Sequence, residues 1–126
     1  MKTKVLVCDD VNEVRTELAK ILVENGCEVT CVENGLQGLQ AADQECFDLV
    51  IADVHMPVMD GPEMIHNLRT RNNYQQTPIL GLTGDKKSAL VKDMQQCKKS
   101  EIRAWIIKPV QESTVGPMLQ FLFPAA

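Results

Sequence analysis

Short apolar runs recur five times along the chain, and an amphipathic segment follows each of them. The runs are nearly continuous and rich in β-branched residues, which is typical of strands buried on both faces of a sheet. The segments between them repeat apolar residues at helical spacing, as Val14, Leu18 and Leu22 do. We therefore predict strands at residues 4–8, 28–32, 49–52, 78–82 and 104–107.

Five helices are expected between and after these strands. In the fourth helix, Leu90, Met94 and Cys97 are predicted to share the inner side. In the last helix, the Gly116-Pro117 pair is expected to restrict regular helix to a short stretch, because proline disturbs helix interiors. The predicted helices cover residues 12–24, a segment opened by Asn34-Gly35, a segment around Pro62–Leu68, residues 86–98 and approximately 113–123.

Regular strand–helix alternation predicts an α/β fold, with a five-stranded parallel sheet that is doubly wound by helices on both faces. Right-handed crossovers leave few topologies for such a chain. We expect the flavodoxin-like strand order 2-1-3-4-5, in which the first and third strands are neighbours where the winding direction reverses. Ligands bind at that point, beyond the carboxyl ends of the strands.

Length and composition exclude several other classes of protein. The 126 residues fit one domain, and the net charge of −4 argues against a general nucleic-acid binder. No apolar run reaches the roughly 20 residues that cross a bilayer, and no secretory signal is recognisable. Five cysteines without C-x-x-C spacing argue against a disulfide framework or a structural zinc site. These features predict a single cytoplasmic domain, residues 1–126, without membrane insertion.

Polar residues follow the predicted strands at their carboxyl ends. Asp9 and Asp10 follow the first strand, Asp53 the third, Thr83 the fourth and Lys108 the fifth. Three carboxylates in one cleft would repel one another, and a hard cation such as Mg²⁺ relieves that repulsion. The lysine adds a positive charge for an anion, and the threonine adds a hydroxyl donor. This combination indicates a phosphoryl-transfer site.

Five separated motifs, in order and covering essentially the whole chain, resemble the receiver domain of two-component response regulators, the CheY-like family. The resemblance implies that Asp53 is the phosphoacceptor. It also implies that Asp10, Asp53 and the backbone carbonyl of His55 hold Mg²⁺, with help from Asp9. The matching motifs are VLVCDD at 5–10, NG at 34–35, DLVIADVHMPVMDG at 48–61, PILGLTG at 78–84 and AWIIKP at 104–109.

By the same resemblance, Thr83 and Lys108 contact the phosphoryl group, and Trp105 takes the place of the family's switch aromatic. The implied phosphodonor is a sensor histidine kinase or a histidine phosphotransfer protein. Phosphorylation would reshape the face formed by helix four, strand five and helix five for a downstream target protein. No nucleic acid is expected to bind this domain alone. The protein would be a monomer or a phosphorylation-dependent dimer. It would not be an enzyme, apart from catalysing its own phosphoryl transfer and dephosphorylation.

Alternatives remain open at the level of both residues and function. Asp9 and Asp10 are also suited to cap a helix, and Lys108 to a surface position. The chain is alternatively the N-terminal receiver of a longer regulator, such as a transcription factor or hybrid kinase, or a scaffold that acts without phosphorylation. A nucleotide-binding P-loop and a G-x-G-x-x-G fingerprint are both absent.

Two surface features are predicted in addition. His55 and Asp85 flank the site at variable positions of the family, and we expect them to pair and to orient the water that hydrolyses the phosphoryl group. The fourth helix carries a basic patch that is expected to face an acidic partner, and the alternative is a solvated helix face without a partner. The patch consists of Lys86, Lys87, Lys92, Lys98, Lys99 and Arg103, with Asp93 and Glu101 opposing it in charge.

Overall fold

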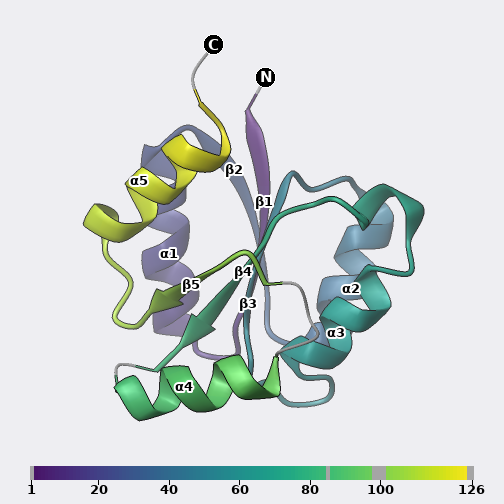
Figure 1. The fold of residues 1–126 in the computed structure, drawn as a ribbon. Helices are drawn as coiled ribbons and strands as arrows, with labels where there is room; N and C mark the ends of the chain where they lie inside the picture. Colours follow the sequence, from purple (N-terminus) through teal and green to yellow (C-terminus); the bar gives the residue numbers. More distant parts are fainter. Residues whose placement is uncertain (1, 85, 98–101, 125–126) are drawn as a thin grey trace.

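A computed structural model describes residues 2–84, 86–97 and 102–124 of the chain. Five strands alternate with five helices, and one 3₁₀ turn precedes the fourth strand (Figure 1). The elements are β1 (Thr3–Cys8), α1 (Asn12–Glu24), β2 (Cys27–Val32), α2 (Gly35–Gln44), β3 (Leu49–Asp53), α3 (Gly61–Leu68), η1 (Asn72–Tyr74), β4 (Ile79–Thr83), α4 (Lys87–Gln96), β5 (Ala104–Ile107) and α5 (Glu112–Leu122).

The sheet has the order β2-β1-β3-β4-β5 with every pair parallel, which confirms the predicted topology. Cys8 of β1 pairs with Ala52 of β3, so these two strands end side by side. Thr83 of β4 pairs with Ile107 of β5 in the same way. The residues that follow all these strands therefore meet at one edge of the sheet.

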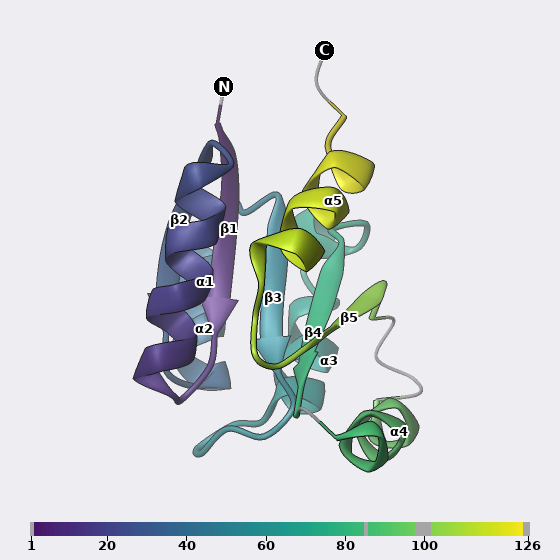
Figure 2. The same cartoon turned by 90° about the vertical axis from the view of Figure 1, so that its left-hand side faces the viewer.

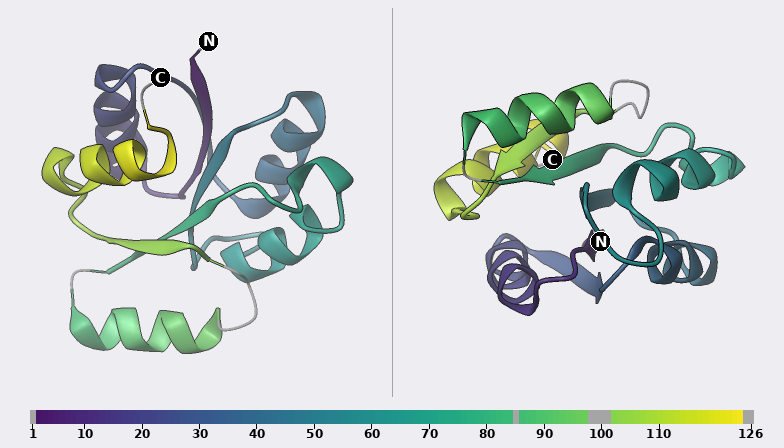
Figure 3. Two further views of the ribbon diagram at one scale, coloured as in Figure 1. Left: turned by 45° about the horizontal axis from the view of Figure 1, so that its top comes forward. Right: turned by 90° about the horizontal axis from the view of Figure 1, so that it is seen from below.

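Two apolar layers cover the sheet. One layer includes Val7, Ile51 and Leu82 of the strands and packs against α1 and α5. The other includes Leu6, Val50 and Ile79 and packs against α2 and α3. The views in Figures 2 and 3 show α1 and α5 on one side of the sheet, while α4 lies off the carboxyl end of β4. The sheet is thus wound on both faces, as predicted.

The inner side of α4 differs from the prediction. Met94 was expected to face the sheet, but its side chain is 49% exposed, and Asp93 lies inward with only 4% exposure. Within Lys87–Gln96, Asp93 is the one fully buried residue, while Cys97 just beyond the helix is also buried. The helix is therefore rotated so that a carboxylate occupies the middle of its inner face. Hydrogen bonds to that carboxylate, described below, offset the cost of burying it.

The expectation for the last helix is wrong, because α5 runs through Gly116-Pro117 without interruption over 11 residues. A proline ring normally collides with the Cβ of the preceding residue in helical conformation. Gly116 has no Cβ, and it is buried against the side chain of Glu112. The pair therefore continues the helix at the cost of one backbone hydrogen bond.

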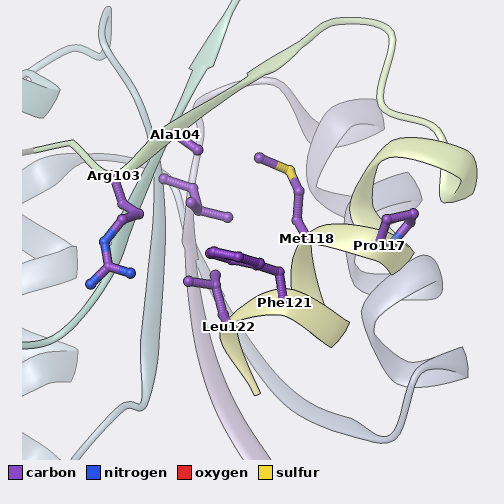
Figure 4. Close-up of a pocket in the computed structure, with 7 residues that line it drawn as sticks. Arg103, Ala104, Pro117, Met118, Phe121 and Leu122 are labelled. Carbon is purple, nitrogen blue, oxygen red and sulfur yellow. The ribbon is translucent and has the colours of Figure 1, made fainter. Parts of the chain in front are cut away.

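An apolar cavity of about 300 Å³ lies between the start of β5 and the second half of α5 (Figure 4). Met118, Phe121 and Leu122 line it from α5, and Ala104 lines it from β5. This cavity is at the amino end of β5, whereas the polar residues collect at the carboxyl ends of the strands. Among the described residues, no helix has both the length and the apolar character that crossing a membrane requires.

Candidate functional site

Three carboxylates lie together at the ends of β1 and β3. One oxygen from each of Asp9, Asp10 and Asp53 lies within 4.8 Å of the others. Asp53 is the last residue of β3, and Asp9 and Asp10 directly follow β1. Asp9 and Asp53 are buried, whereas Asp10 is exposed. The cluster therefore has a buried floor and one ligand on the solvent side.

Asp9 is held from its main chain and its side chain. Its Oδ1 accepts a hydrogen bond from the backbone N–H of Val11 at 2.8 Å, and its carbonyl accepts one from Arg15 Nη1 at 2.6 Å. Helix α1 starts at Asn12 with Val11 as its N-cap and has no side-chain cap. Asp9 and Asp10 therefore do not cap this helix, so the alternative interpretation of the two residues as helix caps is wrong.

Lys108 bridges two of the carboxylates. Its Nζ lies 3.0 Å from Asp53 Oδ2 and 3.1 Å from Asp9 Oδ2. Its backbone N–H donates to the carbonyl of Thr83 at 2.9 Å, which extends the pairing of β4 and β5 and fixes the start of the side chain. A single ammonium group thus faces two buried carboxylates, with a third nearby.

Burial raises the pKa of Asp53, and the Asp9 carboxylate adds to this effect, while Lys108 and the backbone N–H of His55 act against it. Burial alone would lower the pKa of Lys108, but the Asp53 and Asp9 carboxylates outweigh it and raise the pKa. The cluster carries more negative than positive charge. A bound cation would neutralise this excess negative charge.

The donor set fits a hard divalent cation. The three side-chain ligand atoms are carboxylate oxygens, which Mg²⁺ prefers, and Mg²⁺ usually retains waters and uses only a few protein ligands. Asp9 Oδ2 is buried, and within the described residues its polar contact is the ion pair with Lys108 Nζ at 3.1 Å. An oxygen in that state remains able to accept a cation, or a water bound to one.

The loop after β3 returns close to the end of that strand at Gly61. A Cβ at Gly61 would collide with the carbonyl oxygen of Asp53, so only glycine allows this close approach. The Gly61 N–H donates to the Val54 carbonyl at 3.0 Å, and Asp60 caps α3 by accepting from the Glu63 N–H at 2.9 Å. In the loop between Val54 and Asp60, Val58 has a φ of 68°, a strained conformation for a β-branched residue. Such strain is often found beside functional sites.

The Thr83 hydroxyl makes no hydrogen bond to Asp9, Asp10 or Asp53 in the described part of the chain. It donates its hydrogen bond to Asp93 instead. The distance from Thr83 Oγ1 to Asp93 Oδ2 is 2.6 Å, and both side chains are buried. The other oxygen of Asp93 accepts from His55 Nε2 at 2.9 Å. The expected partner of His55, Asp85, lies outside the described residues.

Sequence reasoning missed the role of Asp93, which it counted only as a charge opposing the basic patch. A signal was present, because Asp93 lies three residues after Leu90 and four before Cys97. That spacing puts an acidic residue in the middle of an apolar helix face. A charged residue at such a place needs hydrogen-bonding partners, and Thr83 and His55 are the partners.

Trp105 lies against the middle of β4. It is the register partner of Gly81, and a Cβ built on Gly81 would lie 2.5 Å from Cζ3 of the indole. Gly81 and Thr83 face the same side of the sheet, since side chains alternate along a strand. The indole therefore lies on the same face of the sheet as the Thr83 side chain.

Comparison with known proteins agrees with this arrangement. The sensory/regulatory protein RpfC of Xanthomonas campestris is 34% identical over 109 residues, which are 85% of this chain and 15% of RpfC. The chain thus spans only a small part of that relative. The structure of the chemotaxis response regulator CheY4 of Vibrio cholerae superposes with a TM-score of 0.86 at 33% identity. That match covers 97% of this chain and 99% of CheY4.

The receiver domain of the sensor histidine kinase PA1611 of Pseudomonas aeruginosa has the same fold, with a TM-score of 0.87 at 24% identity. The match covers 99% of this chain and 100% of that one, and the PA1611 structure holds a magnesium ion in its active-site cleft. The family model for the response regulator receiver domain matches residues 5–120. With its 2-1-3-4-5 sheet and the matching family model, this chain belongs to the response regulator receiver domains of two-component signalling systems.

Proposed function

We propose that residues 1–126 form one receiver domain that accepts a phosphoryl group on Asp53 from a histidine kinase or a histidine phosphotransfer protein. The observation that carries this proposal is the convergence of Asp9, Asp10 and Asp53 within 4.8 Å, with Lys108 Nζ 3.0 Å from Asp53. This set combines a nucleophile, a cation site and a positive charge for the transferred group.

Asp9, Asp10, Asp53 and the backbone carbonyl of His55 are the groups that would hold Mg²⁺. The bound ion would neutralise charge on the transferred phosphoryl group. The magnesium in the cleft of the PA1611 receiver supports this assignment. The exposed position of Asp10 supports it as well, because it leaves an entry from solvent.

In the transfer step, an oxygen of Asp53 attacks the phosphorus of the donor's phosphohistidine. The new O–P bond forms as the P–N bond breaks, and the donor imidazole leaves with the electron pair. Lys108 Nζ is placed to move from the Asp53 carboxylate to a phosphoryl oxygen, which keeps its charge beside the developing anion. Catalysis consists of positioning and charge neutralisation, and no separate substrate is turned over.

The signal would leave the domain through the α4, β5 and α5 face. Thr83 ends β4, which is paired with β3 on one side and with β5 on the other, and Trp105 lies on β5. A change at Asp53 would therefore reach that face through two neighbouring strands. Of the predicted basic patch, Lys86, Lys87 and Lys92 are exposed, while Lys98, Lys99 and Glu101 lie outside the described residues. Asp93 faces inward, so the charged side chains exposed along α4 are those of Lys87 and Lys92. An acidic protein partner fits this face.

Two settings are compatible with the domain. RpfC carries the matching segment as 15% of its length, which favours a receiver within a longer signalling protein. CheY4 is matched over 99% of its chain, which favours a receiver that works alone. In either setting we infer a cytoplasmic location, which is supported by five free cysteines, two of them exposed.

The test is labelling with radioactive acetyl phosphate. Wild type should be labelled with Mg²⁺ present and lose nearly all label in excess chelator. Asp53→Asn should remain unlabelled, because the amide is not a nucleophile for this transfer. The matched control is Asp48→Asn, an exposed acid at the opposite end of β3 whose carboxylate accepts from the Lys4 N–H at 2.9 Å. It should label like wild type. Full labelling of Asp53→Asn would refute the proposal.

A further inference from the structure

Asp93 uses both of its carboxylate oxygens inside the protein, apart from the three-carboxylate cluster. Oδ2 accepts from the Thr83 hydroxyl at 2.6 Å, and Oδ1 accepts from His55 Nε2 at 2.9 Å. Three elements meet here, because Thr83 ends β4, His55 follows β3 and Asp93 belongs to α4. We call these three residues the Asp93 triad.

The Asp93 triad is a large part of what holds α4 in place. Val91 and Met94 of this helix are exposed, and Leu90 is only half-buried, so its apolar contact with the sheet is limited. A buried carboxylate is costly unless it is hydrogen-bonded, and hydrogen bonds to a charged group are stronger than neutral ones. The position of α4 therefore depends on both partners of Asp93.

The Thr83 hydroxyl has one proton and donates one hydrogen bond. In the unmodified domain, Asp93 receives it. A phosphoryl group on Asp53 would be a second, strongly charged acceptor near the same edge of the sheet. The hydroxyl cannot donate to both acceptors, so the Asp93 carboxylate and the phosphoryl group compete for one proton.

We propose that Asp93 is a positioning residue that holds the Thr83 hydroxyl away from the phosphorylation site. It thereby sets how strongly a phosphoryl group on Asp53 must attract that hydroxyl to activate the domain. The proposal rests on the proposed function of Asp53. When Thr83 turns to the phosphoryl group, Asp93 loses one of its two bonds, and α4 is released from β4. His55, whose side chain is 65% exposed, remains the partner of Asp93 and follows α4 as it moves.

The first test needs no phosphodonor and no metal. Amide hydrogen exchange of α4 is measured in wild type, Asp93→Ala, Thr83→Val and the double variant. Thr83→Val should speed exchange in Lys87–Gln96 by about tenfold, the size of one lost charge-assisted hydrogen bond, and Asp93→Ala should speed it further because it also removes the bond to His55. The double variant should exchange no faster than Asp93→Ala alone, because that change has already removed the bond that Thr83→Val removes. Additive effects would overturn the triad.

The second test uses beryllofluoride, a phosphoryl mimic, with Mg²⁺. Trp105 is the only tryptophan of the sequence, so its emission follows the response. Asp93→Ala should respond at about tenfold lower beryllofluoride concentration than wild type, because the competing acceptor is gone. Asp93→Asn should show a smaller shift, since its amide oxygen still accepts from Thr83 without a charge. It also preserves side-chain volume if the alanine variant folds poorly.

Two comparisons separate positioning from a general loosening of α4. Asp93→Ala should give no gain in a Thr83→Val background, which has no hydroxyl to release. Gln95→Ala, an exposed change on the same helix, should respond like wild type. Equal half-saturation in wild type and Asp93→Ala, or an equal gain in the Thr83→Val background, would overturn the inference alone. A wild type that neither responds to beryllofluoride nor labels at Asp53 would overturn the proposed function and the inference together.

Discussion

At the scale of single residues, small side chains decide what the large ones can do. Gly81 leaves room in β4 for the indole of Trp105, and Gly61 lets the loop after β3 approach the Asp53 carbonyl. Neither role is visible in the sequence, because a glycine inside a strand or at a helix start has many explanations. The partner that fills its space comes from a distant part of the chain.

The Gly81→Ala variant should show how closely Trp105 depends on this space. The added methyl group would lie 2.5 Å from Cζ3 of the indole, so the ring has to move. We expect a loss of about 1–3 kcal/mol in the free energy of unfolding, as for other overpacked sites. Urea denaturation measures this loss, and tryptophan emission should shift to longer wavelength as the ring meets water. Gly84→Ala, whose new Cβ would lie 3.3 Å from Ala89 Cβ, is the milder control. Unchanged emission in Gly81→Ala would contradict the packing described.

At the scale of helices and strands, the strands and the residues after them were predictable, whereas the orientation of α4 was not. Asp9, Asp53 and Lys108 each follow an apolar run, so chain order alone brings them to one edge of the sheet. The rotation of α4 depends on hydrogen bonds from Thr83 and His55, which belong to other elements. Helical periodicity favoured Met94 as the inward residue because periodicity counts apolar residues and not buried charges.

Helix α5 offers a test of the cost of an interior proline. Pro117 has no N–H to donate within the helix, although α5 continues through it. Pro117→Ala restores that donor, and part of the gain is offset because the unfolded chain becomes more flexible. We expect the free energy of unfolding to rise by about 1–2 kcal/mol, measured by urea denaturation. Pro124→Ala, beyond the end of the helix, removes a proline without restoring a helical bond and should give no such gain. A loss of stability in Pro117→Ala would show that the ring's packing in the cavity of Figure 4 matters more.

At the scale of the whole molecule, the candidate site is a place where stability is given up for function. Burial raises the pKa of Asp53, so the folded protein holds a proton there more tightly than the unfolded chain does. The folded state is therefore penalised for the ionised Asp53 above the raised pKa. The penalty disappears as the pH falls below the ordinary value of 3.8.

Thermal unfolding in chelator should reveal this penalty. Asp53→Asn should melt at a higher temperature than wild type at pH 7, because it removes a buried charge from a cluster with excess negative charge. The difference should shrink as the pH falls through the raised pKa of Asp53 and vanish below the ordinary value of 3.8. Mg²⁺ at about 100 times its dissociation constant should then stabilise wild type by about 2.7 kcal/mol and Asp53→Asn by much less. A variant that melts below wild type at pH 7 would show that the Lys108–Asp53 pair outweighs the burial of the charge.

The attachment of α4 through Asp93, with little apolar contact, has a consequence for temperature. The heat capacity change of a transition follows mainly the apolar surface that it exposes to water. Moving α4 exposes little such surface, since Val91 and Met94 already face solvent. The logarithm of the equilibrium constant for this movement should therefore be nearly linear in inverse temperature, unlike the curved profile of global unfolding. The domain would keep a regular, easily extrapolated response as its surroundings warm or cool.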